Sequence, residues 1–226
     1  MTPETESKHR EKVTRARVIE AALHLMDTEG LEAVSMRRVG RELGVEAMSL
    51  YNHVRDKEDL LDGIREHVLS EFLEPGTEGP WEERARRAAR SWRHIMRAHP
   101  NMLTLISEAK RFSMTPSSTQ PTETALRLLR EGGLSEEDAV KAFCALGGFI
   151  VGFVMFEIGV ERSTETGTDL PSPQRLTASL DPDEFPCFLA SLPHLMKGDI
   201  DERFEYGLDL LIAGVRSKTA VVAESH

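Results

Sequence analysis

The chain has 226 residues, of which 40% are hydrophobic and 29% charged, and its formal net charge at pH 7 is −10. This length is enough for one or two domains with a buried core, and the polar N-terminus lacks the apolar segment of a signal peptide. Apolar residues recur at helical spacing over long stretches, and no long stretch alternates apolar with polar residues. We therefore predict an all-α fold.

Residues 1–13 are polar and mixed in charge. We predict a flexible N-terminal arm there, which either lies along phosphates or is simply solvated. A helical pattern follows and ends at Gly30, as helices often end at glycine. The next pattern begins after Ser35, a favourable N-cap, and Gly44 then permits a tight turn.

A third, short helix is expected over about residues 47–54, and Asp56 can cap a fourth that continues to about residue 73. Two helices joined by a short glycine-containing turn, packed on a preceding helix, form a helix-turn-helix. We therefore predict a helix-turn-helix DNA-binding domain over residues 14–61. Residues 8–57 carry ten Lys/Arg against eight Asp/Glu, so the negative charge of the chain lies elsewhere.

On a helical projection of the third helix, Val45, Leu50 and Val54 point inward, while Met48 and Asn52 point outward with Ser49 close by. Tyr51 and His53 flank the buried stripe on opposite sides. In a major groove such a face meets base edges, and the flanking polar groups reach phosphates. Lys57 begins the fourth helix, where its ammonium and free N–H groups favour a phosphate. The alternative is an ordinary polar helix surface.

The segments ALHLMDTEGLEAVSMRRVGRELGV and SLYNHVRDKEDLL resemble the DNA-binding domain of the tetracycline-repressor (TetR) family. The resemblance implies an N-terminal three-helix helix-turn-helix domain and a C-terminal helical domain that binds a ligand and dimerises. It implies that Tyr51 and Lys57 contact phosphates. Asn52 stands where the namesake repressor has an aromatic residue, so we expect a different operator. Positions at or near the DNA would be Arg37, Ala47, Met48, Ser49 and His53.

The segments RHIMRAHPNMLTLI, GLSEEDAVKAFCALGGFIVGFVMFE and FEYGLDLLIAGVRSK resemble the C-terminal domain of the same family more loosely. We therefore predict an effector-binding and dimerisation domain over residues 81–218. Residues 161–185 are rich in Thr, Ser, Pro and Asp and predict a flexible loop within it. The two positions that hold the Mg²⁺-bound drug in the namesake fall on or near Ile106 and Phe156, which cannot bind a hard cation. We expect no metal and no cofactor.

The segment RFSMTPSSTQP interrupts two helical patterns where the family has a gating loop. We predict that a small apolar effector binds between the flanking helices. Its candidate walls are apolar residues at helical spacing, and the alternative for each is an ordinary core position. These candidates are Trp92, Met96, Leu103, Ile106, Phe112, Leu126, Leu129 and Phe149.

Residues 142–160 are the most apolar segment, but only 15 uncharged residues separate Lys141 from Glu157, short of the roughly 20 that a membrane span needs. We therefore interpret this segment as a helix buried in a core or a dimer interface, with no membrane role. Glycines on such a helix permit close helix–helix approach, which suits a homodimer. The predicted interface comprises Gly148, Gly152, Phe156, Leu208, Leu211, Ile212 and Val215.

Cys144 and Cys187 lie among apolar residues without metal-ligand spacing, which predicts two reduced core thiols in a cytoplasmic protein. Six arginines between Arg84 and Arg97 predict a solvated or salt-bridged helix face. No catalytic motif stands out, so we do not expect an enzyme.

Taken as a whole, the sequence predicts a homodimeric transcriptional regulator, most simply a repressor that an effector releases from a palindromic operator. One alternative is an activator or global regulator without an effector. The other is a helical small-molecule carrier or enzyme with a vestigial helix-turn-helix.

Overall fold

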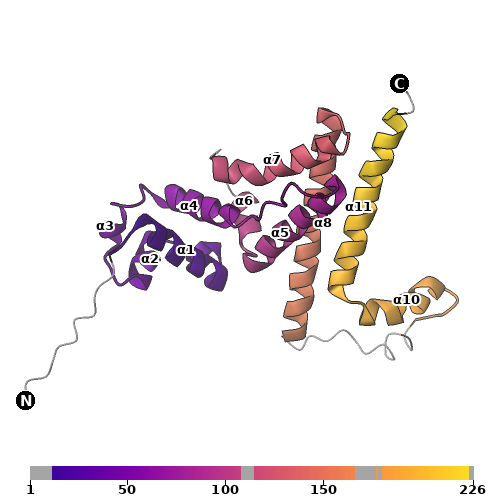
Figure 1. The fold of residues 1–226 in the computed structure, drawn as a ribbon. Helices are drawn as coiled ribbons and strands as arrows, with labels where there is room; N and C mark the ends of the chain where they lie inside the picture. The colour runs from indigo at the N-terminus through magenta and orange to yellow at the C-terminus, as the bar shows by residue number, and fades with distance from the viewer. Residues whose placement is uncertain (1–11, 108–114, 166–176, 178–179, 224–226) are drawn as a thin grey trace, which may run out of the picture. The chain divides into compact units, whose positions relative to one another are not determined.

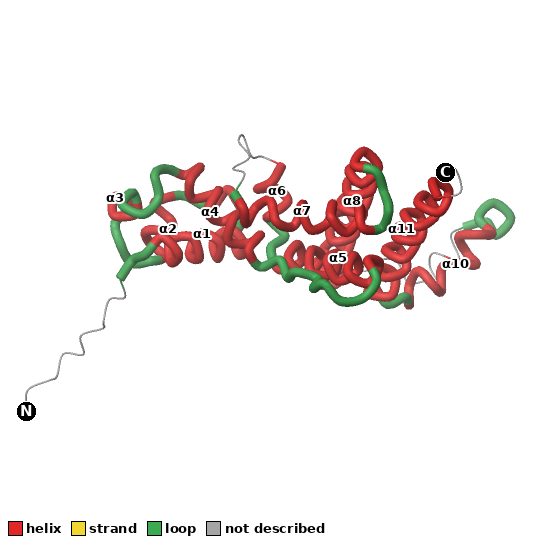
Figure 2. Tube along the Cα trace, turned by 45° about the horizontal axis from the view of Figure 1, so that its top comes forward, coloured by secondary structure: helices red, strands yellow, loops and turns green. Residues whose placement is uncertain are grey.

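The computed structural model describes residues 12–107, 115–165, 177 and 180–223, and every regular element in these ranges is a helix (Figures 1 and 2). The predicted all-α fold is confirmed. The chain forms two compact units. The first comprises residues 1–71 and 101–118, and the second comprises residues 72–100 and 119–226.

The first unit contains α1 (Arg15–Glu29), the 3₁₀ helix η1 (Leu31–Ala33), α2 (Met36–Glu42), α3 (Ala47–Leu50), α4 (Lys57–Ser70) and α6 (Met102–Ser107). α1 and α4 pack together, and α2 contacts α3. The apolar faces of these helices supply the core of the unit, and burying each large aliphatic side chain stabilises it by about 1.5–3 kcal/mol. Its fully buried side chains include those of Val18, Met26, Leu50, Leu60 and Ile64.

The predicted helix ends in the first unit rest on local signals that the structure confirms. α1 ends before Gly30, whose φ is 92°. The Ser35 hydroxyl accepts a hydrogen bond from the Arg38 N–H at 3.3 Å, and Asp56 accepts one from the Asp59 N–H at 2.8 Å. Each cap satisfies a helix N–H that has no partner within its own helix.

Two predicted lengths in this unit are wrong. α3 ends at Leu50, and residues 51–53 form a turn in which the N–H groups of Asn52 and His53 bond to carbonyls three residues earlier. Such bonds tighten the last turn of a short helix. α4 ends at Ser70 and not near residue 73.

The second unit contains α5 (Trp81–Ala98), most of α7 (Pro116–Glu131), α8 (Glu136–Glu165), α10 (Pro186–Lys197) and α11 (Ile200–Ala223). α8 contacts both α5 and α11, and Figure 1 shows α11 running beside α8. A core cluster joins helices that are distant in sequence. It consists of Leu129, Leu134, Ala139 and Val215, with Trp81, Leu126, Ala142, Phe143 and Leu146 packed against it.

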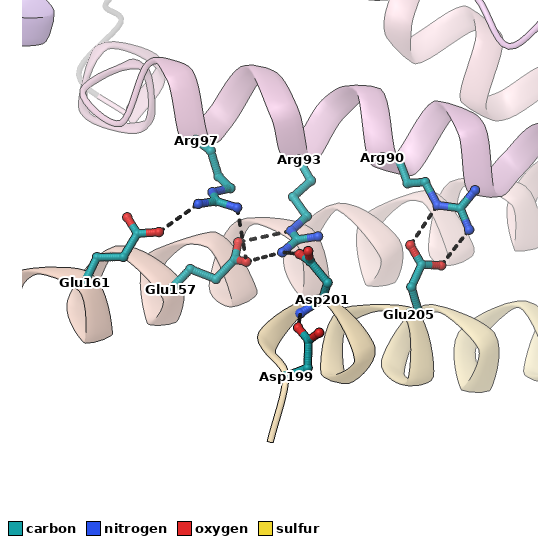
Figure 3. A network of polar contacts seen from close by, with 8 residues as sticks. All are labelled: Arg90, Arg93, Arg97, Glu157, Glu161, Asp199, Asp201 and Glu205. Atoms are coloured by element: carbon teal, nitrogen blue, oxygen red, sulfur yellow. Dashed lines mark hydrogen bonds and ion pairs between the residues drawn. The ribbon is translucent and has the colours of Figure 1, made fainter. Parts of the chain in front are cut away.

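A row of arginines on α5 reaches acidic side chains on α8 and α11 (Figure 3). Arg90 bonds both oxygens of Glu205 at 2.7 Å. Arg93 bonds Glu157, whose side chain is 1% exposed, and its guanidinium lies 4.4 Å from the ring centroid of Phe204. These contacts confirm that the arginine row is a salt-bridged helix face. They join α5 to α8 and α11.

Two further predictions about the second unit are wrong. Residues 161–165 are helical because α8 continues to Glu165, so the predicted loop 161–185 begins too early. Cys144 and Cys187 are free but exposed, since they lie on parts of α8 and α10 that the chain's own core does not cover. Residues 136–163 of α8 are long and apolar enough to cross a membrane, yet only 17% of their most apolar window is buried within the chain.

Candidate DNA-binding site

The turn between α2 and α3 depends on two glycines. A Cβ on Gly40 would lie 2.9 Å from the carbonyl oxygen of Val45, closer than real Cβ contacts. The Val45 N–H donates to the Gly40 carbonyl at 2.8 Å. Gly44 has φ 66°, which side-chain-bearing residues rarely adopt. Together these residues hold α3 tightly against α2.

α3 and the turn after it separate inward from outward side chains as the sequence predicts. Leu50 and Val54 are buried, whereas Val45, which was also predicted to point inward, is half-buried. Met48 is 73% exposed, Tyr51 is 46% exposed and Asn52 is exposed. The exposed side chains form one surface beside a rigid turn, and their chemistry suits base edges and phosphates.

The remaining predicted residues of this segment, Ala47, Ser49 and His53, are half-buried. The Ser49 hydroxyl donates to the Glu46 carbonyl at 2.7 Å. The backbone carbonyl of His53 accepts a hydrogen bond from Arg15.

The cations of α2 and of the start of α4 include both paired and unpaired side chains. Arg38 is paired with Glu29. Arg37 and Lys57 are exposed, and within the described ranges neither has a hydrogen bond or an ion pair. Arg41 lies four residues after Arg37 on the same face of α2. It is also exposed and has no hydrogen bond or ion pair within the described residues. Sequence reasoning missed Arg41, although its i+4 spacing from Arg37 was a usable signal.

An ion pair between Arg15 on α1 and Asp59 on α4, the Arg15–Asp59 clamp, holds the segment that joins α3 to α4. Arg15 Nη2 bonds Asp59 Oδ1 at 2.8 Å, and Arg15 Nη1 bonds the His53 carbonyl at 2.9 Å. Asp59 Oδ2 also accepts the Arg55 N–H at 2.8 Å. The hydrogen bonds from Arg15 outweigh the opposing effect of burial and lower the pKa of Asp59 from 3.8 to about 2.

This clamp was not predicted, because 44 residues separate its partners in the sequence. It fixes the backbone at the end of the turn that carries Tyr51 and Asn52 and just after it, through the His53 carbonyl and the Arg55 N–H. It also neutralises a carboxylate in the first turn of α4, where Lys57 would meet a phosphate.

The predicted effector walls fall in different environments. Leu129 belongs to the core cluster and Leu126 packs against it, while Met96 is fully buried. Phe149 stacks on Phe204 with ring centroids 5.5 Å apart. Trp92 is half-buried, Leu103 and Ile106 lie on α6 in the first unit, and Phe112 is outside the described residues.

Some of the predicted dimer residues are buried within the chain and others are exposed. Leu208, Ile212 and Val215 are buried within the chain and Leu211 is half-buried, so the first three pack its own core. Gly148 and Gly152 are exposed, and a Cβ on either would meet nothing within 4 Å. Phe156 is exposed. Other exposed apolar side chains on α8 and α11 are Val140, Met155, Val160, Tyr206 and Leu210.

Helices joined by a glycine turn, an outward Met–Tyr–Asn surface and unpaired cations define a helix-turn-helix regulator of the DNA-binding class. Comparison with known families gives the same class. Residues 18–64 match the family described as bacterial regulatory proteins, tetR family. Residues 74–219 match the tetracyclin repressor-like C-terminal domain. The chain belongs to the TetR family of transcriptional regulators.

Individual relatives are similar over nearly the whole chain. The transcriptional repressor DrrR1 of Streptomyces coeruleorubidus is 32% identical over 90% of this chain and 77% of its own length. The class D tetracycline repressor of Escherichia coli is 29% identical over 90% of this chain and 89% of its own. Among solved structures, ActR of Streptomyces coelicolor bound to actinorhodin is 30% identical, with a TM-score of 0.76 over 92% of this chain and 98% of its own.

Proposed function

We propose that the protein is a cytoplasmic, homodimeric repressor that binds a palindromic operator and is released from it by a small apolar effector. The observation that carries the DNA-binding part is the surface of α3 and its following turn. Met48, Tyr51 and Asn52 are exposed there, in the same unit as Arg37, Arg41 and Lys57, which no carboxylate among the described residues neutralises. We assign Met48 and Asn52 to base edges. Phosphate contacts fall to Tyr51, Lys57, Arg37 and Arg41.

The dimer proposal draws support from the uncovered apolar side of α8 and α11. Exposed Met155, Phe156 and Leu210 would remain in water in an isolated chain, whereas monomers rarely expose large apolar patches. Exposed Gly148 and Gly152 permit a second helix to approach the α8 backbone closely. A two-fold axis through this surface would present two reading surfaces to half-sites about 34 Å apart.

The effector proposal draws support from a relative. ActR is structurally similar and has been determined in complex with actinorhodin. We propose that this chain likewise responds to a small, largely apolar molecule, with half-buried Trp92 among the contacts. To shift the DNA-binding equilibrium from 99:1 to 1:99, the effector must prefer the released state by about 5.5 kcal/mol.

The experiment begins with selection of bound duplexes from a random pool by the purified full-length protein. Fluorescence anisotropy then compares the enriched duplex with a scrambled one at two salt concentrations. The matched pair of variants is Arg37→Gln and Arg38→Gln, which remove the same charge from adjacent positions. Arg37 is unpaired in the described part of the chain, whereas Arg38 is held by Glu29.

Arg37→Gln should weaken binding and reduce the slope of log affinity against log salt by about one, and Arg38→Gln should change both less. Equal effects would refute the assignment of Arg37. Failure to enrich any duplex would refute the DNA-binding proposal itself. Adding actinorhodin to the bound complex provides a first probe of effector release.

A further inference from the structure

A polar contact set in the second unit centres on the carboxylate of Glu74. Its Oε1 accepts hydrogen bonds from Gln120 Nε2 and from the Thr124 hydroxyl, both at 2.9 Å. Arg127 adds an ion pair at 3.8 Å. Glu74 lies on the segment that follows α4 in sequence, and its three partners lie on α7. The carboxylate therefore fastens the chain leaving α4 to α7.

Thr124 is the buried member of this set, since its side chain is 0% exposed. A hydroxyl has a single hydrogen to donate, and here it is donated to the Glu74 carboxylate while the hydroxyl oxygen lies 3.5 Å from Gln120 Nε2. Hydrogen bonds to a charged acceptor are about twice as strong as neutral ones. The contact therefore depends on both the buried Thr124 hydroxyl and the Glu74 carboxylate.

The rest of the segment is fastened to α5 in the same unit. The Leu73 N–H donates to the Ser91 hydroxyl at 2.9 Å. Arg87 donates to the backbone carbonyls of Pro75 and Glu78, both at 2.8 Å. These bonds hold the backbone around Glu74 against α5, and the Glu74 side chain joins the same segment to α7.

The contact between Glu74 and α7 lies close in sequence to the points where the chain passes between its two units. The chain passes from one unit to the other three times, and two of these passages lie between residues 71 and 72 and between residues 118 and 119. The passage between residues 118 and 119 lies inside α7, two residues before Pro121. Proline has no N–H to donate to the carbonyl four residues earlier, so it weakens the helix at that point. Glu74 therefore links two of the places where the units are connected.

We propose that Glu74 is a positioning residue that couples α7 to the segment leaving α4, so that DNA binding in the first unit and the state of α7 in the second depend on each other. This inference rests on the proposed function. Coupling of this kind is reciprocal, and a residue that carries it changes the response of one site to the other without having to change either affinity alone.

The test measures hydrogen exchange of residues 119–131 in the full-length protein, with and without the selected duplex. Glu74→Ala removes the carboxylate, and Thr124→Val removes the buried hydroxyl at nearly constant shape. Glu78→Ala is the matched control, because it removes an exposed carboxylate from the same segment, and no hydrogen bond or ion pair of that carboxylate occurs within the described residues. Operator affinity and the unfolding temperature are measured for every variant.

In the wild type and in Glu78→Ala, DNA should slow exchange in this segment by about 5-fold or more, the lower range of allosteric coupling. In Glu74→Ala and Thr124→Val that response should be lost while operator affinity stays within about twofold. The double variant should behave like either single one, since both break one contact. A full response in both single variants would overturn the inference with DNA binding intact, as would a wild type that binds DNA without a response.

Discussion

The Arg15–Asp59 clamp gives a prediction whose size follows from the structure. Asp59 is 12% exposed and its pKa is lowered from 3.8 to about 2. Each pKa unit corresponds to about 1.36 kcal/mol, so the charged carboxylate stabilises the fold by at most about 2.4 kcal/mol. Arg15 is 44% exposed, and solvent screening lowers the expected loss in Asp59→Asn to about 1–2 kcal/mol.

The pH dependence has a definite sign. The folded-state pKa of Asp59 lies below its ordinary value, so folding favours the charged form. The stabilisation is fully present above about pH 4 and is lost as the pH falls through about 2. The difference in unfolding free energy between wild type and Asp59→Asn should therefore be full at pH 7, smaller at pH 3 and almost absent at pH 2.

Urea unfolding at these pH values measures the difference directly. The matched control is Glu58→Gln, which removes the neighbouring carboxylate from the same helical turn. Glu58 is exposed, and within the described ranges it has no hydrogen bond or ion pair, so its loss should cost only a few tenths of a kcal/mol. An Asp59→Asn variant as stable as the wild type at pH 7, or a difference that persists at pH 2, would show that Arg15 does not stabilise the charged form of Asp59.

Three other predictions concern packing and assembly. Gly40→Ala should cost about 1–3 kcal/mol in thermal unfolding and should weaken operator binding, because the added Cβ meets a backbone carbonyl in the turn. Arg93→Met should cost about 3–5 kcal/mol in urea unfolding, since it leaves the buried Glu157 carboxylate without its main partner, whereas Arg97→Met at the exposed end of the row should cost about 1 kcal/mol or less. Met155→Lys should shift the sedimentation coefficient from dimer to monomer, and an unchanged dimer would exclude this face as the interface.

Local sequence signals predicted much of the first unit. Gly30, Ser35 and Asp56 mark helix ends through their own conformational preferences and side-chain hydrogen bonds, which act within a few residues. The end of α3 was wrong because a helix of four residues is too short for its periodicity to define a boundary. The outward positions of Met48 and Asn52 were nevertheless predicted, since buried Leu50 and Val54 fix the rotation of the segment.

Long-range features were not predictable from a single sequence. Nothing local indicates that Arg15 meets Asp59 or that Glu74 meets Thr124, because those contacts depend on how the helices pack. For the same reason the sequence placed Leu208, Ile212 and Val215 in a dimer interface, although they are buried within the chain. Apolar residues occur on several sides of α11, and only the packed chain shows that Leu208 and its neighbours face the chain's own core. Nothing local shows which sides of α8 and α10 face the core, so the exposed positions of Cys144 and Cys187 were not predicted.

We propose that the surface formed by α3 and its following turn reads DNA sequence while the start of α4 holds a phosphate. The most direct measurement compares the duplexes enriched by the wild type, by Asn52→Ala and by Lys57→Gln. Asn52→Ala should relax the preference at one position in each half-site, worth about 1–3 kcal/mol, and Lys57→Gln should weaken all sequences about equally. If Asn52→Ala enriches the same duplexes as the wild type with undiminished preference, the claim is contradicted.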